Sequence, residues 1–408
     1  MFLNYNGKKS LEEVFNSIED IELRYVEGNR NARSMLIWGE NLAVMKYLLY
    51  KYGMKGKVDL VYIDPPFGTN NTFRISNDKA NTISQAEDGE LAYDDSLIGA
   101  EYLEFIRERL LLIKELLSDK GSIYLHIDNK IGHYVKVLMD EVFGRENFVN
   151  DLTRIKCNPK NFERKGYGNI KDMILFYSKT KDYIWHPQNL NFSDNDIFRL
   201  YKKIDADGRR YTTIPLHAPG ETKNGITGQA WRGMLPPKGR HWRVSPMELD
   251  ELNKKGLIEW SRNGVPRKKI YADEKKKNGK KLQDILDFKD PQKPVYPTEK
   301  NLDLLKLIIS TSSNPDSLVM DCFSGSGTTL IAAKELGRYW IGIDSSKKAI
   351  EVTLERLKTK QRRITDEDYT YFEVLQLSKP KNNNSSFTAS LINSDLEKEI
   401  SKTSGPTI

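Results

Sequence analysis

The chain has 408 residues, of which 38% are hydrophobic and 30% charged, and its formal net charge is +7. This length supports a sizeable core and two or three cooperating units, and the modest charge permits a polyanionic partner without requiring one. No apolar run approaches the roughly 20 residues of a membrane span, which argues against a membrane protein. Two cysteines and five scattered histidines exclude a disulfide framework and a Cys/His metal site.

The N-terminal residues 1–34 form a polar lead-in in which residues 11–23 have a weak helical pattern. This segment lacks the charged-then-apolar order of a secretory signal, which predicts a cytoplasmic location. A short strand is predicted at 35–38, and a helix at 42–50 leads from it into the next strand.

A buried strand is predicted at residues 58–63, where β-branched and large apolar side chains run almost unbroken. The strand ends at Asp64, because Pro65 and Pro66 cannot donate to a sheet ladder. The carboxylate and a proline carbonyl there are two acceptors that suit the two N–H bonds of an exocyclic amino group. Phe67, which follows, can stack on the ring that carries this group. Taken alone, the tetrapeptide is equally consistent with an ordinary turn.

The middle of the chain has the alternation of an α/β protein. Residues 68–96 form a long polar loop, a candidate lid or DNA-contacting segment. Apolar side chains spaced by three and four predict a core-facing helix over 99–117. A strand at 122–127, a helix at 131–143 and a strand at 173–177 follow, which predicts βαβ units and a mostly parallel sheet. His126, alone at a strand end, is interpreted as structural.

From about residue 180 to 290 the periodicity weakens and Gly, Pro, Trp and basic residues become frequent. Arginine suits guanine edges and phosphates, whereas each tryptophan is as easily a core residue. The lysines of residues 265–281 are either solvated surface or phosphate contacts. The candidate DNA-binding residues are Arg232, Arg240, Arg243, Arg262, Arg267, Lys268, Lys269, Lys275, Lys276 and Lys277.

A helix over 298–310 precedes a second motif, in which residues 318–329 read as a strand, a glycine turn and a helix start. Thr328 or Thr329 is the predicted helix cap, and the following strand ends at Asp344. Glycines allow close approach of a ligand, and an acid at this place can bind ribose hydroxyls. The turn lacks the third glycine of a dinucleotide fingerprint and the Gly-Lys-Ser/Thr of a phosphate loop. The tail after 380 is predicted to be partly disordered.

Two of these motifs, Asp-Pro-Pro-Phe at 64–67 and Phe-Ser-Gly-Ser-Gly at 323–327, resemble the paired signatures of S-adenosylmethionine-dependent DNA amino-methyltransferases. Their order resembles the β class, which includes modification subunits of type III restriction systems and many adenine-specific modification enzymes. Segments similar to other parts of this family lie at 37–42, 121–128, 143–148 and 295–300.

The resemblance implies an α/β, Rossmann-like methyltransferase fold with an inserted, irregular target recognition domain. The implied division is a lead-in at 1–34, a catalytic half at 35–180, the target recognition domain at 181–290, a donor-binding half at 291–378 and a tail at 379–408. It also implies a double-stranded DNA partner, with a homodimer and a restriction endonuclease partner as further expectations. The source would be a bacterium, an archaeon or a phage.

The implied reaction is methyl transfer from S-adenosylmethionine to adenine N6, with the base flipped out of the duplex. Asp64 and the Pro65 carbonyl would accept the amino hydrogens, Phe67 would stack on the base and Pro66 would keep the turn rigid. Asp344 would bind the ribose of the donor. The remaining residues implied to hold or approach the donor are Thr298, Lys300, Asp321, Cys322, Phe323, Ser324, Gly325, Ser326, Gly327 and Thr328.

Other functions share parts of this pattern. Cytosine N4 transfer uses the same geometry, although its enzymes more often carry serine in place of Asp64. Cytosine C5 transfer is rejected, because it needs a cysteine preceded by proline, and neither Cys157 nor Cys322 has that neighbour. RNA or protein amide methylation is less consistent with the basic insert. A catalytically inactive DNA-binding subunit is less consistent with two intact motifs.

Overall fold

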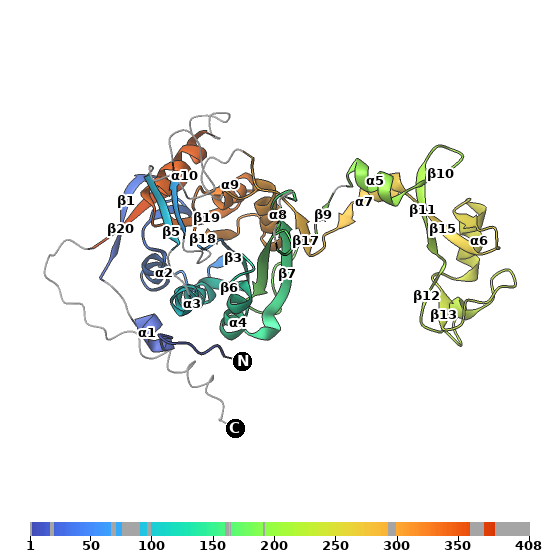
Figure 1. The fold of residues 1–408 in the computed structure, drawn as a ribbon, viewed down its shortest axis with the longest axis horizontal. Helices are drawn as coiled ribbons and strands as arrows, with labels where there is room; N and C mark the ends of the chain where they lie inside the picture. Colours follow the sequence, from blue (N-terminus) through green and yellow to red (C-terminus); the bar gives the residue numbers. More distant parts are fainter. Residues whose placement is uncertain are drawn as a thin grey trace, which may run out of the picture.

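The computed structural model describes residues 2–16, 20–66, 71–75, 90–95, 99–159, 163, 165–190, 192–292, 299–359 and 371–379. Within these ranges the chain forms a ten-stranded sheet with helices on both faces, and a smaller group of strands and helices extends away from it (Figure 1). No described helix has both the length and the hydropathy of a transmembrane span.

The large sheet brings together strands from both ends of the chain. Its order is β1 (Glu22–Gly28), β20 (Phe372–Ser378), β2 (Ser34–Trp38), β19 (Tyr339–Asp344), β18 (Leu318–Asp321), β3 (Val58–Ile63), β6 (Leu117–Ile127), β8 (Lys171–Ser178), β7 (Phe148–Ile155) and β17 (Ile285–Asp287). Neighbours run parallel except that β1 is antiparallel to β20 and β8 is antiparallel to both β6 and β7. The predicted α/β fold with a mostly parallel sheet is confirmed.

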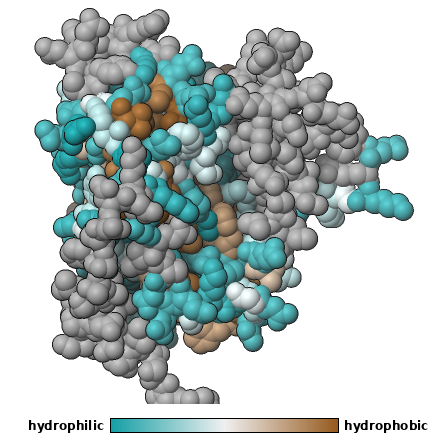
Figure 2. Space-filling view, turned by 90° about the vertical axis from the view of Figure 1, so that its left-hand side faces the viewer, coloured by the Kyte–Doolittle hydropathy of each residue, from teal (hydrophilic) through white to brown (hydrophobic). Residues whose placement is uncertain are grey.

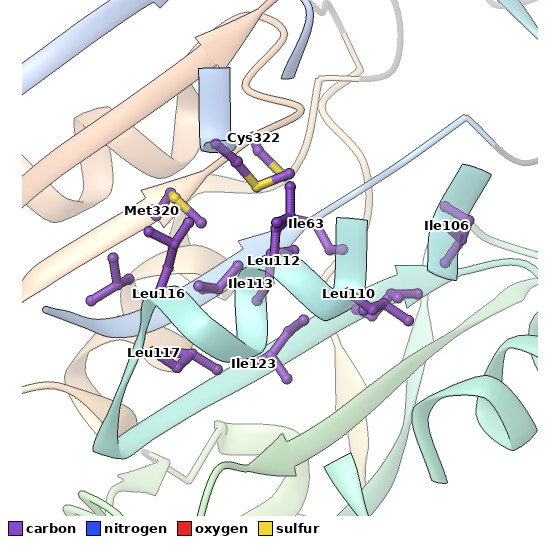
Figure 3. Packing of buried hydrophobic residues seen from close by; sticks show 14 of the residues in the cluster. Ile63, Ile106, Leu110, Leu112, Ile113, Leu116, Leu117, Ile123, Met320 and Cys322 are labelled. Carbon is purple, nitrogen blue, oxygen red and sulfur yellow. The ribbon is translucent and has the colours of Figure 1, made fainter. Parts of the chain in front are cut away.

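Two hydrophobic cores cover the two faces of this sheet, which is why β3 reads as a nearly continuous apolar run. Val61 and Ile63 of β3 join a core with α2 (Asn41–Tyr50), α3 (Gly99–Leu116) and α4 (Gly132–Phe143). Figure 3 shows part of it, with Ile63 near Cys322 and the leucines of α3. Leu60 and Tyr62 face the other core, with α8 (Leu302–Ser312), α9 (Thr328–Glu335) and α10 (Lys347–Thr359).

The boundary between β18 and β3 positions the site. The two strands are parallel neighbours, with Val319 opposite Leu60 and Met320 opposite Val61. The chain leaves β18 through α9 on one face, and it leaves β3 toward α3 on the other face. Connections that diverge in this way make a topological switch point, and ligands of open α/β sheets bind beside the carboxyl ends of the strands there.

The inserted segment contains more regular structure than the sequence indicates. A four-stranded antiparallel sheet has the order β10 (Lys203–Ile204), β11 (Arg210–Pro215), β15 (Pro266–Tyr271) and β14 (Ile258–Trp260). The insert also contains α5 (Asp194–Leu200), β12 (His217–Pro219), β13 (Arg240–Trp242), α6 (Pro246–Lys254) and α7 (Ala272–Asn278). The strands are two to six residues long, which is too short for a clear period. The interpretation as irregular is therefore corrected.

A narrow stem connects the insert to the large sheet. In it, β9 (Asn189–Leu190) pairs antiparallel with β16 (Lys280–Lys281), so the outgoing and returning chains run side by side. Figure 1 shows the insert projecting from this stem to the right of the main body. Trp231, Trp242 and Leu249 form a small core of its own within it. The insert therefore has a hydrophobic core that is separate from the two cores of the large sheet.

Several predicted elements differ in extent. The helix expected at 11–23 is α1 (Leu11–Asn16), and Leu23 lies in β1, which pairs with β20. The helix expected from 298 begins at Leu302, because Asn301 caps it by accepting from the Asp303 and Leu304 amides. The loop expected at 68–96 contains an antiparallel pair, β4 (Asn71–Ile75) and β5 (Glu90–Asp95), and the rest of it lies outside the described residues. The tail after 380 also lies outside them.

The surface opposite the insert exposes both polar and apolar residues (Figure 2). Viewed from the left-hand side of Figure 1, it shows a strip of apolar residues bordered by hydrophilic ones (Figure 2). A small cavity is lined by residues of α2 and its surroundings, among them Leu42, Lys46 and Tyr50. Glu40 also lines it, but this side chain caps α2 through the Ala43 amide.

Candidate active site

Asp64 lies directly after β3, at the switch point. Its Oδ2 atom is 2.8 Å from the Nζ atom of Lys300, and the two side chains are 16% and 12% exposed. Its Oδ1 atom is buried and has no hydrogen-bond partner among the described residues. A buried acceptor without a donor is rare in folded proteins, and it indicates a position that a ligand fills.

The rest of the first motif is described in part. Pro65 is buried and Pro66 is half-buried, which is consistent with a turn fixed by two rings. Phe67 lies outside the described residues, and so does Thr298 of the donor set. Their predicted roles remain predictions.

The glycine loop follows β18, the parallel neighbour of β3. Gly325 and Gly327 have φ angles of 49° and 73°, in the left-handed region that favours glycine. A Cβ atom on Gly327 would lie 2.5 Å from Cγ2 of Thr353, so only glycine fits there. Ser324 and Ser326 are buried, and the Ser324 hydroxyl has no hydrogen-bond partner among the described residues. The loop thus offers close backbone approach and one unused hydroxyl.

The predicted threonine cap of the following helix is wrong. Gly327 is the N-cap of α9, no side chain caps this helix, and Thr328 is its first residue. The Thr329 hydroxyl instead donates to Asp321 Oδ2 at 2.6 Å. The threonine therefore holds the acid at the end of β18, and the helix start has its first amide groups available for a ligand.

Asp344, at the end of β19, holds the glycine loop. Its two oxygens accept from the Gly325 and Ser346 amides, each at 2.8 Å. A carboxylate has further lone pairs, so these bonds leave it able to accept from a ribose hydroxyl. Burial raises the pKa of Asp344, and the two amide bonds lower it.

Asp321 is the most deeply buried acid of the site. Burial raises its pKa to about 7, although the Thr329 hydroxyl and the Phe323 amide favour the charged form, and the charges of Asp64 and Asp344 raise the pKa further. Three carboxylates therefore influence one another at the ends of β3, β18 and β19. Such a site suits a cationic ligand, because positive charge offsets their repulsion.

Four residues outside the two motifs support the glycine loop. Arg356 of α10 donates to the Ser326 carbonyl at 2.7 Å and to the Thr328 hydroxyl at 3.2 Å. From the same helix, the Thr353 hydroxyl donates to the Gly325 carbonyl at 2.9 Å. On the other side of the loop, Asn41 donates to the Cys322 carbonyl at 2.7 Å and accepts from Arg109 at 2.6 Å.

These supporting residues were missed by sequence reasoning. Asn41 lies in the family-like segment 37–42, which could have identified it. Arg356 and Thr353 lie on an ordinary amphipathic helix, where no local signal separates them from surface residues. Phe323, by contrast, was expected at the donor, and its ring packs 6.0 Å from that of Phe105.

His126 is structural, as interpreted. It is fully buried, its Nδ1 atom is 2.8 Å from the Tyr62 hydroxyl, and its Nε2 atom is 3.2 Å from Asp172 Oδ2. Burial lowers its pKa, with a smaller contribution from the charge of Lys300. This histidine ties β3 to β6 and β8 beneath the site.

Six of the ten candidate DNA-binding residues have described side-chain partners, and they divide into two groups of three. Three are paired with acids: Arg232 with Asp250 at 2.9 Å, Lys269 with Asp205 at 2.7 Å and Lys276 with Asp194 at 3.5 Å. The other three are arginines that donate hydrogen bonds to uncharged groups. Arg240 donates to the His217 ring, Arg243 donates to the Pro215 carbonyl, and Arg267 donates to the hydroxyl and carbonyl of Thr213.

The arginines with uncharged partners lie close together. The charges of Arg240, Arg243 and Arg267 all act on His217, whose pKa is lowered first by burial and then by these three. Within the part of the chain that the structure describes, none of the three arginines forms an ion pair with an acid. We call Arg240, Arg243 and Arg267 the arginine triad. Arg262, Lys268, Lys275 and Lys277 lie elsewhere in the insert, on or beside β14, β15 and α7.

A glycine loop after one strand, an acid after the next, and an acceptor carboxylate across the switch point define the site of a Rossmann-like methyltransferase. Residues 58–355 match the family profile N6_N4_Mtase, described as DNA methylase. The chain belongs to this family of DNA methylases, which confirms the resemblance predicted from the two motifs. Its methyl donor is S-adenosylmethionine.

Named relatives agree with this assignment. The chain is 40% identical over 365 residues to the type II methyltransferase M.EcaI of Enterobacter cloacae, covering 87% of this chain and 77% of that protein. It is 28% identical to the StyLTI Mod subunit, a type III restriction-modification protein of Salmonella typhimurium, covering 81% of this chain and 54% of that one. It therefore spans about half the length of this relative. The solved structure of the M1.HpyAVI–SAM complex is 20% identical, with a TM-score of 0.40 over 79% of this chain and 99% of that one.

The residues present fit the donor. S-adenosylmethionine carries a sulfonium and an ammonium group, and the three acids of the site provide the complementary charge. Gly325 and Gly327 leave room for it, and the Ser324 hydroxyl, which has no partner among the described residues, is available for a further polar contact. Within the described residues no cluster of metal-ligating side chains is found.

Proposed function

We propose that this chain transfers a methyl group from S-adenosylmethionine to the N6 atom of adenine in duplex DNA. The observation that carries the proposal is the Oδ1 atom of Asp64, which is buried, has no partner among the described residues and follows the strand next to that of the glycine loop. An exocyclic amino group supplies the missing donor. Because a paired base cannot present this group, the base would have to leave the stack.

The chain's own residues would position the nucleophile. Asp64 and the Pro65 carbonyl accept the two amino hydrogens, and Phe67 stacks on the base. These contacts orient the nitrogen lone pair and keep the amine still, which lowers the entropic part of the barrier. The bound donor supplies an already activated methyl group. As the N–C bond forms and the S–C bond breaks, the nitrogen becomes cationic, the nearby carboxylate stabilises that charge, and a proton leaves to solvent.

Cytosine N4 transfer is the alternative, because cytosine carries the same kind of amino group. The aspartate at position 64 favours adenine, since the resemblance associates serine with the N4 enzymes. DNA methylated by the purified enzyme should be digested to nucleosides and analysed by mass spectrometry. We expect N6-methyladenine, and N4-methylcytosine would replace this proposal with the alternative. Single-molecule sequencing of the same DNA would give the recognition sequence.

We also propose that the insert is the target recognition domain and that its arginine triad contacts DNA. No described carboxylate offsets the positive charge of these arginines, so they suit phosphates or guanine edges. The type II and type III relatives support a role in restriction-modification. A homodimer and a restriction endonuclease partner are further expectations. Size-exclusion chromatography with light scattering would measure the oligomeric state.

A further inference from the structure

Two consecutive residues connect the two halves of the site. Lys300 pairs with Asp64 at 2.8 Å, as described above. Glu299, its neighbour, pairs with Arg356, the residue that also holds the Ser326 carbonyl and the Thr328 hydroxyl. The returning chain therefore contacts Asp64 directly, and it contacts the glycine loop through Arg356. We call residues 299–300 the clip.

The two carboxylate oxygens of Asp64 have different environments. Lys300 occupies Oδ2, whereas Oδ1 stays buried and without a described partner. A buried acceptor without a hydrogen bond costs about 1–3 kcal/mol, so an unrestrained carboxylate would rotate to find a donor or water. An ammonium on one oxygen prevents that rotation, because turning the group would break a charge-assisted bond.

The surroundings make this restraint necessary. Asp321 lies at the end of β18, the strand next to β3, and Asp344 ends β19, one strand further on, so Asp64 faces like charge on that side. Lys300 is 12% exposed, so water screens its attraction to Asp64 weakly. Arg356 and Glu299 are 17% and 10% exposed and fix the backbone immediately before the lysine. The Lys300 ammonium group is therefore fixed by its ion pair with Asp64 and by the Glu299–Arg356 ion pair that anchors the preceding residue.

We propose that Lys300 is a positioning residue that fixes Asp64 with its Oδ1 atom ready for the amino group of the target base. This inference rests on the proposed function. It also changes the role implied by the family resemblance, in which Lys300 lies near the donor. The chemistry passes through Asp64, and Lys300 itself contacts neither base nor donor during transfer.

The test compares Lys300→Met with Lys306→Met. Lys306 of α8 forms a more exposed ion pair, 2.6 Å from Glu335 of α9, and no ion pair with Asp64, Asp321 or Asp344 is found for it among the described residues, so it controls for the loss of a paired lysine. We expect Lys300→Met to lower kcat at least about tenfold, since misplacing a reacting group has a large effect on rate. The KM for DNA and the Kd for S-adenosylmethionine, measured by calorimetry, should change less than about threefold. Lys306→Met should match the wild type.

Two further variants separate positioning from folding. Lys300→Arg keeps a cation and should recover part of kcat, while Lys300→Gln should behave like Lys300→Met. In an Asp64→Asn background, Lys300→Met should have little additional effect, because the residue that it positions is already changed. Thermal unfolding of each variant shows whether it is folded.

Two results would overturn the inference. A weakened Kd for S-adenosylmethionine with kcat retained would make Lys300 a donor contact, and wild-type kcat in both Lys300→Met and Lys300→Gln would make the ion pair purely structural. Failure of the proposed function has different signatures: the wild type would produce N4-methylcytosine in place of N6-methyladenine, or Asp64→Ala would retain transfer, whatever Lys300 does.

Discussion

The sheet domain and the insert use charge in opposite ways. In the sheet domain the charges are buried at strand ends, and Asp321 and Asp344 are held by hydrogen bonds from the loop that they support. In the insert the charges lie on short strands near the surface, and Arg240 and Arg243 are exposed. Buried charge demands fixed partners, whereas exposed charge costs little and leaves the side chain available.

The difference teaches which part of each region is fixed by the fold. At the switch point, register places every acid, because a shift of one residue would turn it to the wrong face of the sheet. In the insert, the small tryptophan core fixes only the framework. The basic side chains of the insert differ in whether they form an ion pair with an acid. Catalysis should therefore depend on single atoms, and DNA binding on the sum of several charges.

The largest effect is expected from Asp64. Asp64→Ala removes the acceptor for the amine, so methyl transfer should fall by about 100- to 1,000-fold, the range for the loss of one preorganised polar group. Tritium incorporation into DNA measures the rate, and calorimetry should show that S-adenosylmethionine still binds. Asp64→Asn keeps one acceptor oxygen and should lose less. Transfer at the wild-type rate by Asp64→Ala would show that catalysis does not depend on this atom.

A smaller effect is expected from the glycine loop, where Gly327→Ala meets two penalties. Its φ of 73° disfavours any Cβ, and the added atom would lie 2.5 Å from Thr353. Gly337 is the control, because its φ is 71° but nothing lies within 4 Å of an added Cβ. Gly337→Ala should lower stability by about 1–2 kcal/mol through backbone strain alone. Gly327→Ala should also weaken S-adenosylmethionine binding, and equal affinities in the two variants would contradict a donor role for this loop.

The same contrast explains what the sequence could predict. The runs at 58–63 and 318–321 are buried on both faces, so composition alone identified the strands and, with them, the edge where Asp64 and Asp321 meet. Arg356 and the cap at Asn301 depend on contacts between distant segments, which leave no local pattern. The arginines of the insert carry the same local signature whether or not an acid pairs with them, so Arg232 and Arg240 could be separated only in three dimensions.

A moderate effect is expected from the arginine triad. Arg240→Ala combined with Arg243→Ala should weaken DNA binding and reduce the slope of log K against log salt by up to about two, because each phosphate contact contributes about 0.9. Arg232→Ala is the control, since Asp250 already neutralises that arginine at 2.9 Å. Fluorescence anisotropy at several salt concentrations measures both quantities.

The lysines of α7 should contribute less to DNA binding. Replacing Lys275, Lys276 and Lys277 together with Ala should weaken binding and flatten the salt slope, by less than the arginine pair does for each charge removed. Lys276 already has Asp194 at 3.5 Å. An unchanged slope would make this helix ordinary surface, and a larger change than that of the arginine pair would reverse the order of the two regions.

The smallest effect concerns pH and belongs to the sheet domain. The pKa of Asp321 is about 7 in the folded chain, mainly through burial, against about 4 for an ordinary aspartate. Between these values the folded state binds more protons than the unfolded state, so this group makes stability fall as pH rises from about 4 to 7. Asp321→Asn removes the titration, and its Tm should therefore decline less over that range than that of the wild type. Donor affinity should show the opposite trend, since a cationic ligand favours the ionised acid: wild-type binding should strengthen as pH rises toward 7, and Asp321→Asn should bind with little dependence on pH. Parallel pH profiles for the two proteins would mean that Asp321 does not titrate in this range, and that the charge complementary to the donor comes from its neighbours.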